Sequence, residues 1–416
     1  MIRFIDLFAG TGGTRLGFES ACKQLNIPAK CVFTSEIDPK AQVTYQTNFG
    51  ELPSGDICTI TNIPDFDFLL AGFPCQPFSY AGKQKGFGDT RGTLFFEIVR
   101  ILKDKTPKAF LLENVRGLLT HDHGRTIKTI VHELEALGYG VSILLLNSSN
   151  FGCPQNRVRI YICGLIGDKP MFTIYSNPGP QDSHTFKKER HQTNKLLVKD
   201  IIEQKVEEKY YCSAEFTQKS IKLVGGDVSE LNGLRYIDYR NGKSVHSWEL
   251  GIKGECSQRE IDLMNNILAN RRLKKFGSQQ DGKKLTKEQI STFWPYQDLE
   301  ELLASLLEKK YLNFKDGRYN PNAGNMSFEV FKILDLNSIA ITVVASDAHR
   351  LGVVQNGRIR HLTPRECARL QGFPDSFVLP KSDTIAYKQL GNAVSVPVIA
   401  AVSKNLIENN KPKISG

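Results

Sequence analysis

The sequence predicts an α/β protein, a doubly wound parallel sheet with a second, smaller α+β domain. In the first 165 residues, short apolar runs alternate with amphipathic helical patterns, which is typical of parallel sheets covered by helices. The sequence becomes more polar after Gly167, and the strand–helix alternation returns from Arg360. A chain of 416 residues is also long enough for two domains.

Six apolar runs are the predicted strands of the sheet. Each is short enough to be a buried strand rather than a helix. They cover residues 2–8, 30–36, 66–71, 109–113, 141–146 and 158–165. A helix is predicted over residues 126–137, because its apolar side chains share one face and Gly138 follows it.

The chain is expected to leave the first domain and later return to it. Residues 1–171 and 351–416 form the predicted first domain, and residues 172–350 form the second. Within the second, residues 257–320 contain helical stretches followed by a hairpin with Asp316-Gly317 at its turn. This order predicts a winged-helix segment.

Composition narrows the class of protein. The net charge of +10 and the pI near 9.0 favour a polyanionic partner. Nine cysteines without regular spacing predict neither a disulfide framework nor a metal site, and they fit a reducing cytoplasm. We find no signal peptide and no apolar run of membrane-spanning length, so a cytoplasmic protein is expected.

A thiol follows the third predicted strand. Phe73-Pro74-Cys75-Gln76 places Cys75 where open α/β sheets carry their functional side chains. Prolines on both sides would stiffen the turn and present the thiol to a cleft. Taken alone, a buried core cysteine is the more common finding.

The first strand runs into a glycine turn that contains Gly10, Gly12 and Gly13. Such a turn lets a helix N-terminus approach a carboxylate or phosphate. Arg15 replaces the third glycine of the dinucleotide fingerprint, which disfavours a nicotinamide cofactor. Glu36 ends the next strand, and Asp56 follows as a further acid. A glycine turn with two such acids suits an adenosine that carries a carboxylate but no phosphates, as S-adenosylmethionine does, although an ordinary strand-to-helix turn looks similar.

Two further strands carry charged side chains at their ends. Glu113 follows an apolar strand, where burial would raise its pKa and let it hold a proton. A salt-bridged core acid is the alternative. Arg157 and Arg159 are two residues apart on a β segment, so both can point at one anionic or carbonyl-bearing ligand.

Taken in order, these motifs resemble the bacterial C5-cytosine DNA methyltransferases, the modification enzymes of restriction–modification systems. The resemblance covers residues 1–165 and 340–416. It includes DLFAGTGG (6–13), GFPCQ (72–76), GKQKGF (82–87), ENV (113–115), QNRVR (155–159), LTPRECARLQGFP (362–374) and YKQLGNAV (387–394). It implies a Rossmann-like, S-adenosylmethionine-dependent sheet and a target-recognition role for the second domain.

The resemblance also implies a catalytic set. Cys75 would attack C6 of a cytosine flipped out of the duplex, so that C5 can accept the methyl group. Glu113 would protonate the N3 edge, Arg159 would bond O2, and Arg157 would support phosphate or base. Asn114 completes the implied catalytic residues.

For the cofactor, the resemblance implies contacts to adenine, ribose and the methionine end. The implied residues are Phe8, Gly10, Gly12, Gly13, Glu36, Ile37, Asp56, Ile57, Pro74, Leu94, Asn392 and Val394. Two positions depart from the family pattern: Ile37 stands where relatives often carry tryptophan, and Ala393 where some carry serine.

Double-stranded DNA is the implied partner of a monomeric enzyme without a metal. Implied contacts are Gln76, with Ser79 and Lys83 of a closing loop, and Thr342 beside the flipped base. A basic run in the second domain is a candidate for phosphate contacts, although it could be a merely solvated face. Its residues are Arg271, Arg272, Lys274 and Lys275.

Two other functions compete with this interpretation. One branch of the fold methylates cytosine in tRNA, but its Cys-Phe-Thr element is absent from this sequence. A non-catalytic DNA-binding regulator would suit a winged helix, but Cys75, Glu113 and Arg159 are all intact. The expected role is therefore methylation that protects host DNA from a restriction endonuclease.

Overall fold

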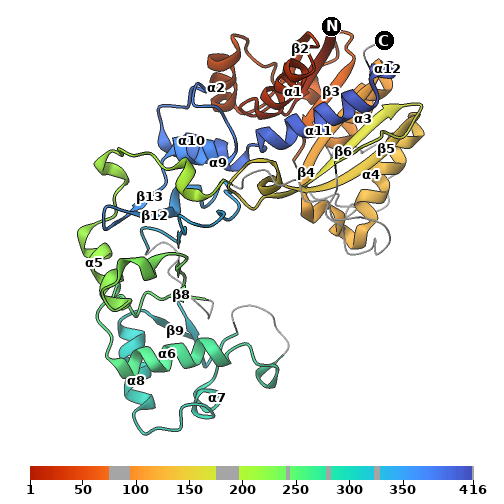
Figure 1. Ribbon diagram of the computed structural model, residues 1–416. Coiled ribbons are helices and arrows are strands. Elements are labelled where there is room, and N and C mark those ends of the chain that lie inside the picture. Colours follow the sequence, from red (N-terminus) through yellow and green to blue (C-terminus); the bar gives the residue numbers. More distant parts are fainter. Residues whose placement is uncertain (75–93, 175–195, 240–243, 278–282, 323–327, 415–416) are drawn as a thin grey trace. The chain divides into compact units, whose positions relative to one another are not determined.

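The computed structural model describes residues 1–74, 94–174, 196–239, 244–277, 283–322 and 328–414 (Figure 1). The chain forms two compact units. The first unit is Met1–Ile202, Asn337–Ala348 and Pro364–Gly416, and the second is Glu203–Leu336 and His349–Thr363.

These bounds differ from the predicted ones at three places. Residues 172–202 and 337–348 fall in the first unit, and residues 351–363 in the second. Backbone pairing explains the last two differences: Ala340 exchanges hydrogen bonds with the Pro154–Asn156 backbone of the first unit, while Gly352 pairs with Ile333 of the second.

The first unit is built on a six-stranded sheet in the order β2-β1-β3-β4-β6-β5. Its strands are β1 (Ile2–Leu7), β2 (Ala29–Ser35), β3 (Phe68–Gly72), β4 (Ala109–Val115), β5 (Tyr139–Asn147) and β6 (Val158–Ile166). The pairs β1–β2, β1–β3 and β3–β4 are parallel, as predicted, but β6 is antiparallel to both β4 and β5.

The connection between β5 and β6 explains this correction to the parallel prediction. Only residues 148–157 separate the two strands, and they form a short 3₁₀ turn and a loop. A parallel neighbour needs a crossover of a dozen or more residues. The chain therefore turns back, and β6 lies between β4 and β5.

Helices cover both faces of this sheet, because successive side chains of a strand point to opposite faces. Phe4 packs with the helices on one face, and the next residue, Ile5, packs with those on the other. The first face holds α1 (Gly13–Gln24) and α11 (Val396–Asn409), and the second holds α3 (Leu94–Lys105) and α4 (Arg125–Ala136) (Figure 1). The remaining helices of this unit are α2 (Pro39–Phe49), α9 (Pro364–Leu370), α10 (Asp383–Asn392) and α12 (Lys411–Ile414).

Residues 383–409 are long and apolar enough, by length and composition alone, to cross a membrane. In the structure, however, α11 buries Val398, Ile399, Val402 and Leu406 in the core on one face of the sheet. The apolar composition of this stretch is therefore that of a core helix.

The second unit contains a small sheet and a group of helices. The sheet order is β13-β12-β11-β7-β8, and a separate hairpin pairs β10 with β9. The strands are β7 (Arg235–Tyr236), β8 (Ser244–Val245), β9 (Leu312–Lys315), β10 (Arg318–Pro321), β11 (Lys332–Ile333), β12 (Leu351–Gln355) and β13 (Arg358–His361). The helices are α5 (Ala214–Leu223), α6 (Gln258–Asn270), α7 (Lys287–Ser291) and α8 (Leu299–Glu308).

The contact between α1 and α11 gives a test of the packing. A methyl group at Gly17 would lie 2.6 Å from the Ile399 Cβ and 2.8 Å from the Val396 carbonyl oxygen. We expect Gly17→Ala to lower the free energy of unfolding by about 1–3 kcal/mol, because the helices must separate. Urea unfolding measures this change.

The matched control is Lys23→Ala on the exposed side of α1, which should change stability by less than about 0.5 kcal/mol. A Gly17→Ala variant as stable as the control would contradict the close packing of α1 on α11.

Candidate active site

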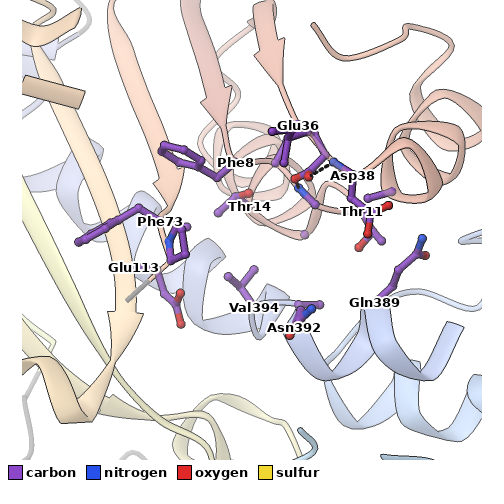
Figure 2. A pocket seen from close by; sticks show the side chains of 18 of the residues that line it. Phe8, Thr11, Thr14, Glu36, Asp38, Phe73, Glu113, Gln389, Asn392 and Val394 are labelled. Atoms are coloured by element: carbon purple, nitrogen blue, oxygen red, sulfur yellow. Dashed lines mark hydrogen bonds between the residues drawn. The ribbon is translucent and has the colours of Figure 1, made fainter. Parts of the chain in front are cut away.

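A cavity of about 570 Å³ opens where β1, β2, β3 and β4 end. Open α/β sheets bind their ligands at this edge, and the volume is within the usual range for small-molecule sites. The wall is completed by residues that precede α11, including Asn392 and Val394 (Figure 2). The whole lining belongs to the first unit.

The structure brings eleven of the twelve predicted cofactor residues to this cavity. They are Phe8, Gly10, Gly13, Glu36, Ile37, Asp56, Ile57, Pro74, Leu94, Asn392 and Val394. Gly12 is not part of the lining. It has a φ of 90°, and an added Cβ would lie 2.2 Å from the Phe49 ring, so this glycine serves the turn itself.

Phe8 enters the cavity from a strained backbone. Its φ is +54°, a conformation that costs a bulky residue on the order of 1–3 kcal/mol. The turn of the chain after β1 imposes this conformation, and the ring lies in the cavity wall (Figure 2). Strain kept at a cavity wall is typical of a functional position.

Glu36 is held in place by two backbone groups. One carboxylate oxygen accepts a hydrogen bond from the Gly10 N–H at 2.7 Å, and the other accepts one from the Asp38 N–H at 2.8 Å (Figure 2). The acid thus joins the glycine turn to the end of β2 and has a fixed orientation in the cavity. Asp56 is fixed similarly, because it accepts from the Cys58 N–H at 3.0 Å.

Several lining residues were missed by the sequence interpretation. They include Thr11, Thr14, Ser35, Asp38, Val344, Ala345, Lys388 and Gln389. Thr11 is the most informative, because its hydroxyl is buried and has no hydrogen-bond partner among the described residues. Thr11 lies between Gly10 and Gly12, so its position in the predicted glycine turn is a sequence signal that identifies it.

A buried acid, Asp6, lies under the glycine turn. Asp6 is completely buried at the end of β1 and accepts a hydrogen bond from the Thr14 hydroxyl at 2.9 Å. Burial raises the pKa of Asp6 from its ordinary value of 3.8 to about 7, although the bond from Thr14 opposes the shift.

Glu113 and Arg159 face the same cavity from β4 and β6. The Arg159 Nε lies 3.3 Å from a Glu113 carboxylate oxygen, and that oxygen has no hydrogen-bond partner in the described part of the chain. Burial raises the pKa of Glu113, and Arg157 and Arg159 only partly oppose this shift. A raised pKa at a cavity wall lets the carboxyl group hold a proton for transfer.

Arg157, predicted to support phosphate or base, also lines the cavity. It is buried, and its guanidinium donates to the Val343 carbonyl oxygen at 2.9 Å and to the Ala393 carbonyl oxygen at 2.7 Å. Burial lowers the pKa of Arg157 to about 10. This arginine therefore anchors two segments of the cavity wall.

Asn114 forms a hydrogen bond to the backbone just before Pro74 and Cys75. Its side chain donates to the Phe73 carbonyl oxygen at 2.9 Å and accepts from the Val115 N–H at 2.8 Å. The amide thus fixes the position of the residue before Pro74. Cys75 itself, with Gln76, Ser79 and Lys83, lies outside the described residues.

The predicted DNA contacts differ in how exposed their side chains are. Arg271 is buried, with 4% of its surface exposed, so it is not available to DNA phosphates. Arg272, Lys274 and Lys275 are exposed. The Thr342 hydroxyl donates to the Asn156 carbonyl oxygen. Within the described ranges, no group of three or more His, Cys, Asp or Glu side chains could hold a metal ion.

The pKa of Asp6 predicts how pH affects stability. Because the folded state binds the proton more tightly than the unfolded state, this acid contributes stability that is complete below its ordinary pKa and is lost as the pH rises to about 7. A tenfold difference in proton affinity between the two states corresponds to about 1.4 kcal/mol. Asp6→Asn removes this dependence.

We therefore expect the free energy of unfolding of Asp6→Asn, relative to wild type, to increase between about pH 4 and about pH 7. Urea unfolding at several pH values measures the difference, and Asp67→Asn, a partly exposed acid at the start of the same sheet, is the control. A difference that does not change with pH would contradict a buried, proton-holding Asp6.

The comparisons with known proteins agree with this geometry. A family model described as C-5 cytosine-specific DNA methylase matches residues 2–408. The chain is 60% identical to the Type II methyltransferase M.BanI of Aneurinibacillus aneurinilyticus, over 100% of this chain and 98% of the relative. It is also 60% identical to the Type II methyltransferase M.HgiCI of Herpetosiphon aurantiacus, over 98% of each chain.

Solved structures show the same fold at low sequence identity. A putative DNA modification methyltransferase from an E. coli prophage matches with a TM-score of 0.56 at 18% identity, over 99% of this chain and 100% of that chain. The Dnmt2 methyltransferase of S. pombe matches with a TM-score of 0.55 at 18% identity, over 98% and 99%. The chain belongs to the C-5 cytosine-specific DNA methylase family and is a DNA (cytosine-5-)-methyltransferase.

Proposed function

We propose that this enzyme flips a cytosine out of a specific duplex site and methylates C5 through a covalent Cys75–C6 adduct, with S-adenosylmethionine as the methyl donor. One observation carries the proposal. A single cavity is lined by the glycine turn, by the Glu113–Arg159 pair and by Pro74, the residue before Cys75. Donor, base and nucleophile would therefore meet in one space.

The cavity fits an adenosine that carries a carboxylate. Glu36 has the fixed orientation needed to accept hydrogen bonds from a ribose, and Phe8 offers a ring to a base. The Thr11 hydroxyl and the N-terminus of α1 lie where a carboxylate would find donors. When bound, S-adenosylmethionine would supply an electrophilic methyl group on a sulfonium sulfur.

In the proposed reaction, the Cys75 thiolate forms a bond to C6 of the cytosine and pushes electron density toward N3 and C5. Glu113, protonated because of its raised pKa, gives its proton to N3. Arg159 donates hydrogen bonds to O2, which holds the ring against Cys75. After C5 is methylated, the C5 proton is lost to solvent and the bond between C6 and Cys75 breaks, which releases the thiolate and restores the aromatic ring. The proton on N3 returns to Glu113, so that the product is neutral 5-methylcytosine.

A base in a stacked duplex cannot present C6 to a thiol at a cavity wall, so the proposal requires base flipping. The names of the relatives support a role in a Type II restriction–modification system. In that role the enzyme would act in the cytoplasm and protect host DNA from the partner endonuclease. Methylation of tRNA is the competing function that the experiments below separate.

The nucleophile gives the first test. We expect Cys75→Ser to abolish transfer of a tritiated methyl group to duplex DNA while duplex binding persists, because a hydroxyl is a much weaker nucleophile than a thiolate. Cys256→Ser, a partly buried thiol of the second unit, is the matched control and should retain activity.

Full methyl transfer by Cys75→Ser would refute the covalent mechanism. A covalent complex with duplex DNA that contains 5-fluorocytosine, but not with tRNA, is the expected substrate result. A complex with tRNA alone would favour the competing function.

The unpartnered hydroxyl in the turn gives the second test. Thr11→Val keeps the shape of the side chain and removes a donor, so we expect the Kd for S-adenosylmethionine to rise about tenfold, the cost of a hydrogen bond to a charged group. Isothermal titration calorimetry measures this Kd. Thr11→Ser should restore binding, and an unchanged Kd in Thr11→Val would remove Thr11 from the cofactor site.

A further inference from the structure

The second unit contains a compact helical segment with its own core. The core residues include Trp248, Leu263, Ile290, Trp294 and Leu306. Along the chain, α6 is followed by Leu285, which pairs with Tyr319, then by α7, α8 and the β9–β10 hairpin. This order, with a third short strand added to the hairpin, is the order of a winged-helix unit.

In a helix-turn-helix unit, the second helix of the pair is the one that enters the major groove of DNA. Here that position is occupied by α8. Its apolar side chains face the core, so its exposed face carries Glu300, Glu301, Ala304 and Glu308. Glu300 is paired with Lys287 at 2.9 Å, but Glu301 and Glu308 form no ion pair among the described residues. These two carboxylates repel the DNA phosphates, and the helix is therefore a poor groove reader.

The tip of the hairpin has the opposite charge. Lys315 and Arg318 are cross-strand partners on either side of the two-residue turn Asp316-Gly317, where both turn residues have positive φ. All four residues are exposed. Like charges placed opposite each other on a hairpin destabilise it, so folding alone does not favour this pair.

The acid nearest in sequence to this pair of cations interacts with a different lysine. Asp316, the acid of the turn, lies 3.6 Å from the Lys284 ammonium. In the part of the chain that the structure describes, no carboxylate forms an ion pair with Lys315 or Arg318. The tip therefore keeps two positive charges side by side, next to the exposed ring of Phe314.

We propose that the β9–β10 hairpin tip of the second unit contacts the phosphate backbone of the DNA substrate through Lys315 and Arg318, and that α8 does not enter the groove. A bound polyanion reduces the repulsion between the two cations. Without such a ligand, the repulsion remains. The proposal depends on DNA as the substrate and not on the Cys75 mechanism.

The test is a salt titration of duplex binding by the full chain, with fluorescence anisotropy on a labelled duplex several helical turns long. Each neutralised phosphate contributes about 0.9 to the slope of log K against log salt. For Lys315→Gln/Arg318→Gln we expect that slope to become shallower by about 2 and the Kd at low salt to rise. A slope equal to the wild-type slope would overturn the proposal.

Two matched double variants sharpen the result. Lys205→Gln/Lys222→Gln removes the same charge from exposed lysines of the same unit and should leave the slope unchanged; an equal loss would mean that total charge, and not the hairpin, sets binding. Glu301→Gln/Glu308→Gln should leave the Kd unchanged, whereas tighter binding would place α8 on the DNA.

Failure of the hairpin proposal is distinguishable from failure of the proposed function. Methyl transfer by the wild type and its loss in Cys75→Ser are measured without reference to the hairpin. Circular dichroism of each variant confirms that these exposed substitutions leave the fold intact.

Discussion

The cavity depends on one buried amide, the side chain of Gln155. It donates to the Leu370 carbonyl oxygen and to the Gln371 side chain, both at 3.1 Å, and accepts from the Val343 N–H at 2.6 Å. Three segments that are far apart in the sequence are thereby joined. Because the amide is completely buried, each bond is made at low dielectric, and losing one partner would leave a costly unsatisfied group. Arg157 continues this junction at the Val343 carbonyl oxygen, so the arginine and the glutamine together hold one wall of the cavity.

Two buried acids of the first unit have raised pKa values, but they lie in different places. Asp6 lies beneath the glycine turn, where the Thr14 hydroxyl holds it in place. Glu113 lies at the cavity wall beside Arg159, close enough for an ion pair to oppose the effect of burial. The first acid therefore supports the turn, while the second faces the cavity, where the proposed reaction assigns it the proton transfer.

The sequence predicted the parts of the site that are local and missed those that depend on distant contacts. The glycine turn, Glu36 and Glu113 each follow an apolar run directly, so strand ends could be found from periodicity alone. The bond between Gln155 and Gln371 joins residues 216 positions apart, and no local pattern encodes it. Arg271 shows the same limit, because a basic run predicts exposure, whereas the fold buries this one member. The direction of β6 depends on the short connection from β5, residues 148–157, and the pattern of apolar runs does not include that length.

The segment 337–348 is a second constraint on the cavity wall. It belongs to the first unit, although the chain on both sides of it belongs to the second. Its middle is fixed by hydrogen bonds to Gln155 and Arg157, and a methyl group at Gly391 would lie 2.2 Å from the Ala345 nitrogen. Val344 and Ala345 of this segment line the cavity. The pinned centre of the segment therefore cannot shift without opening the cavity wall.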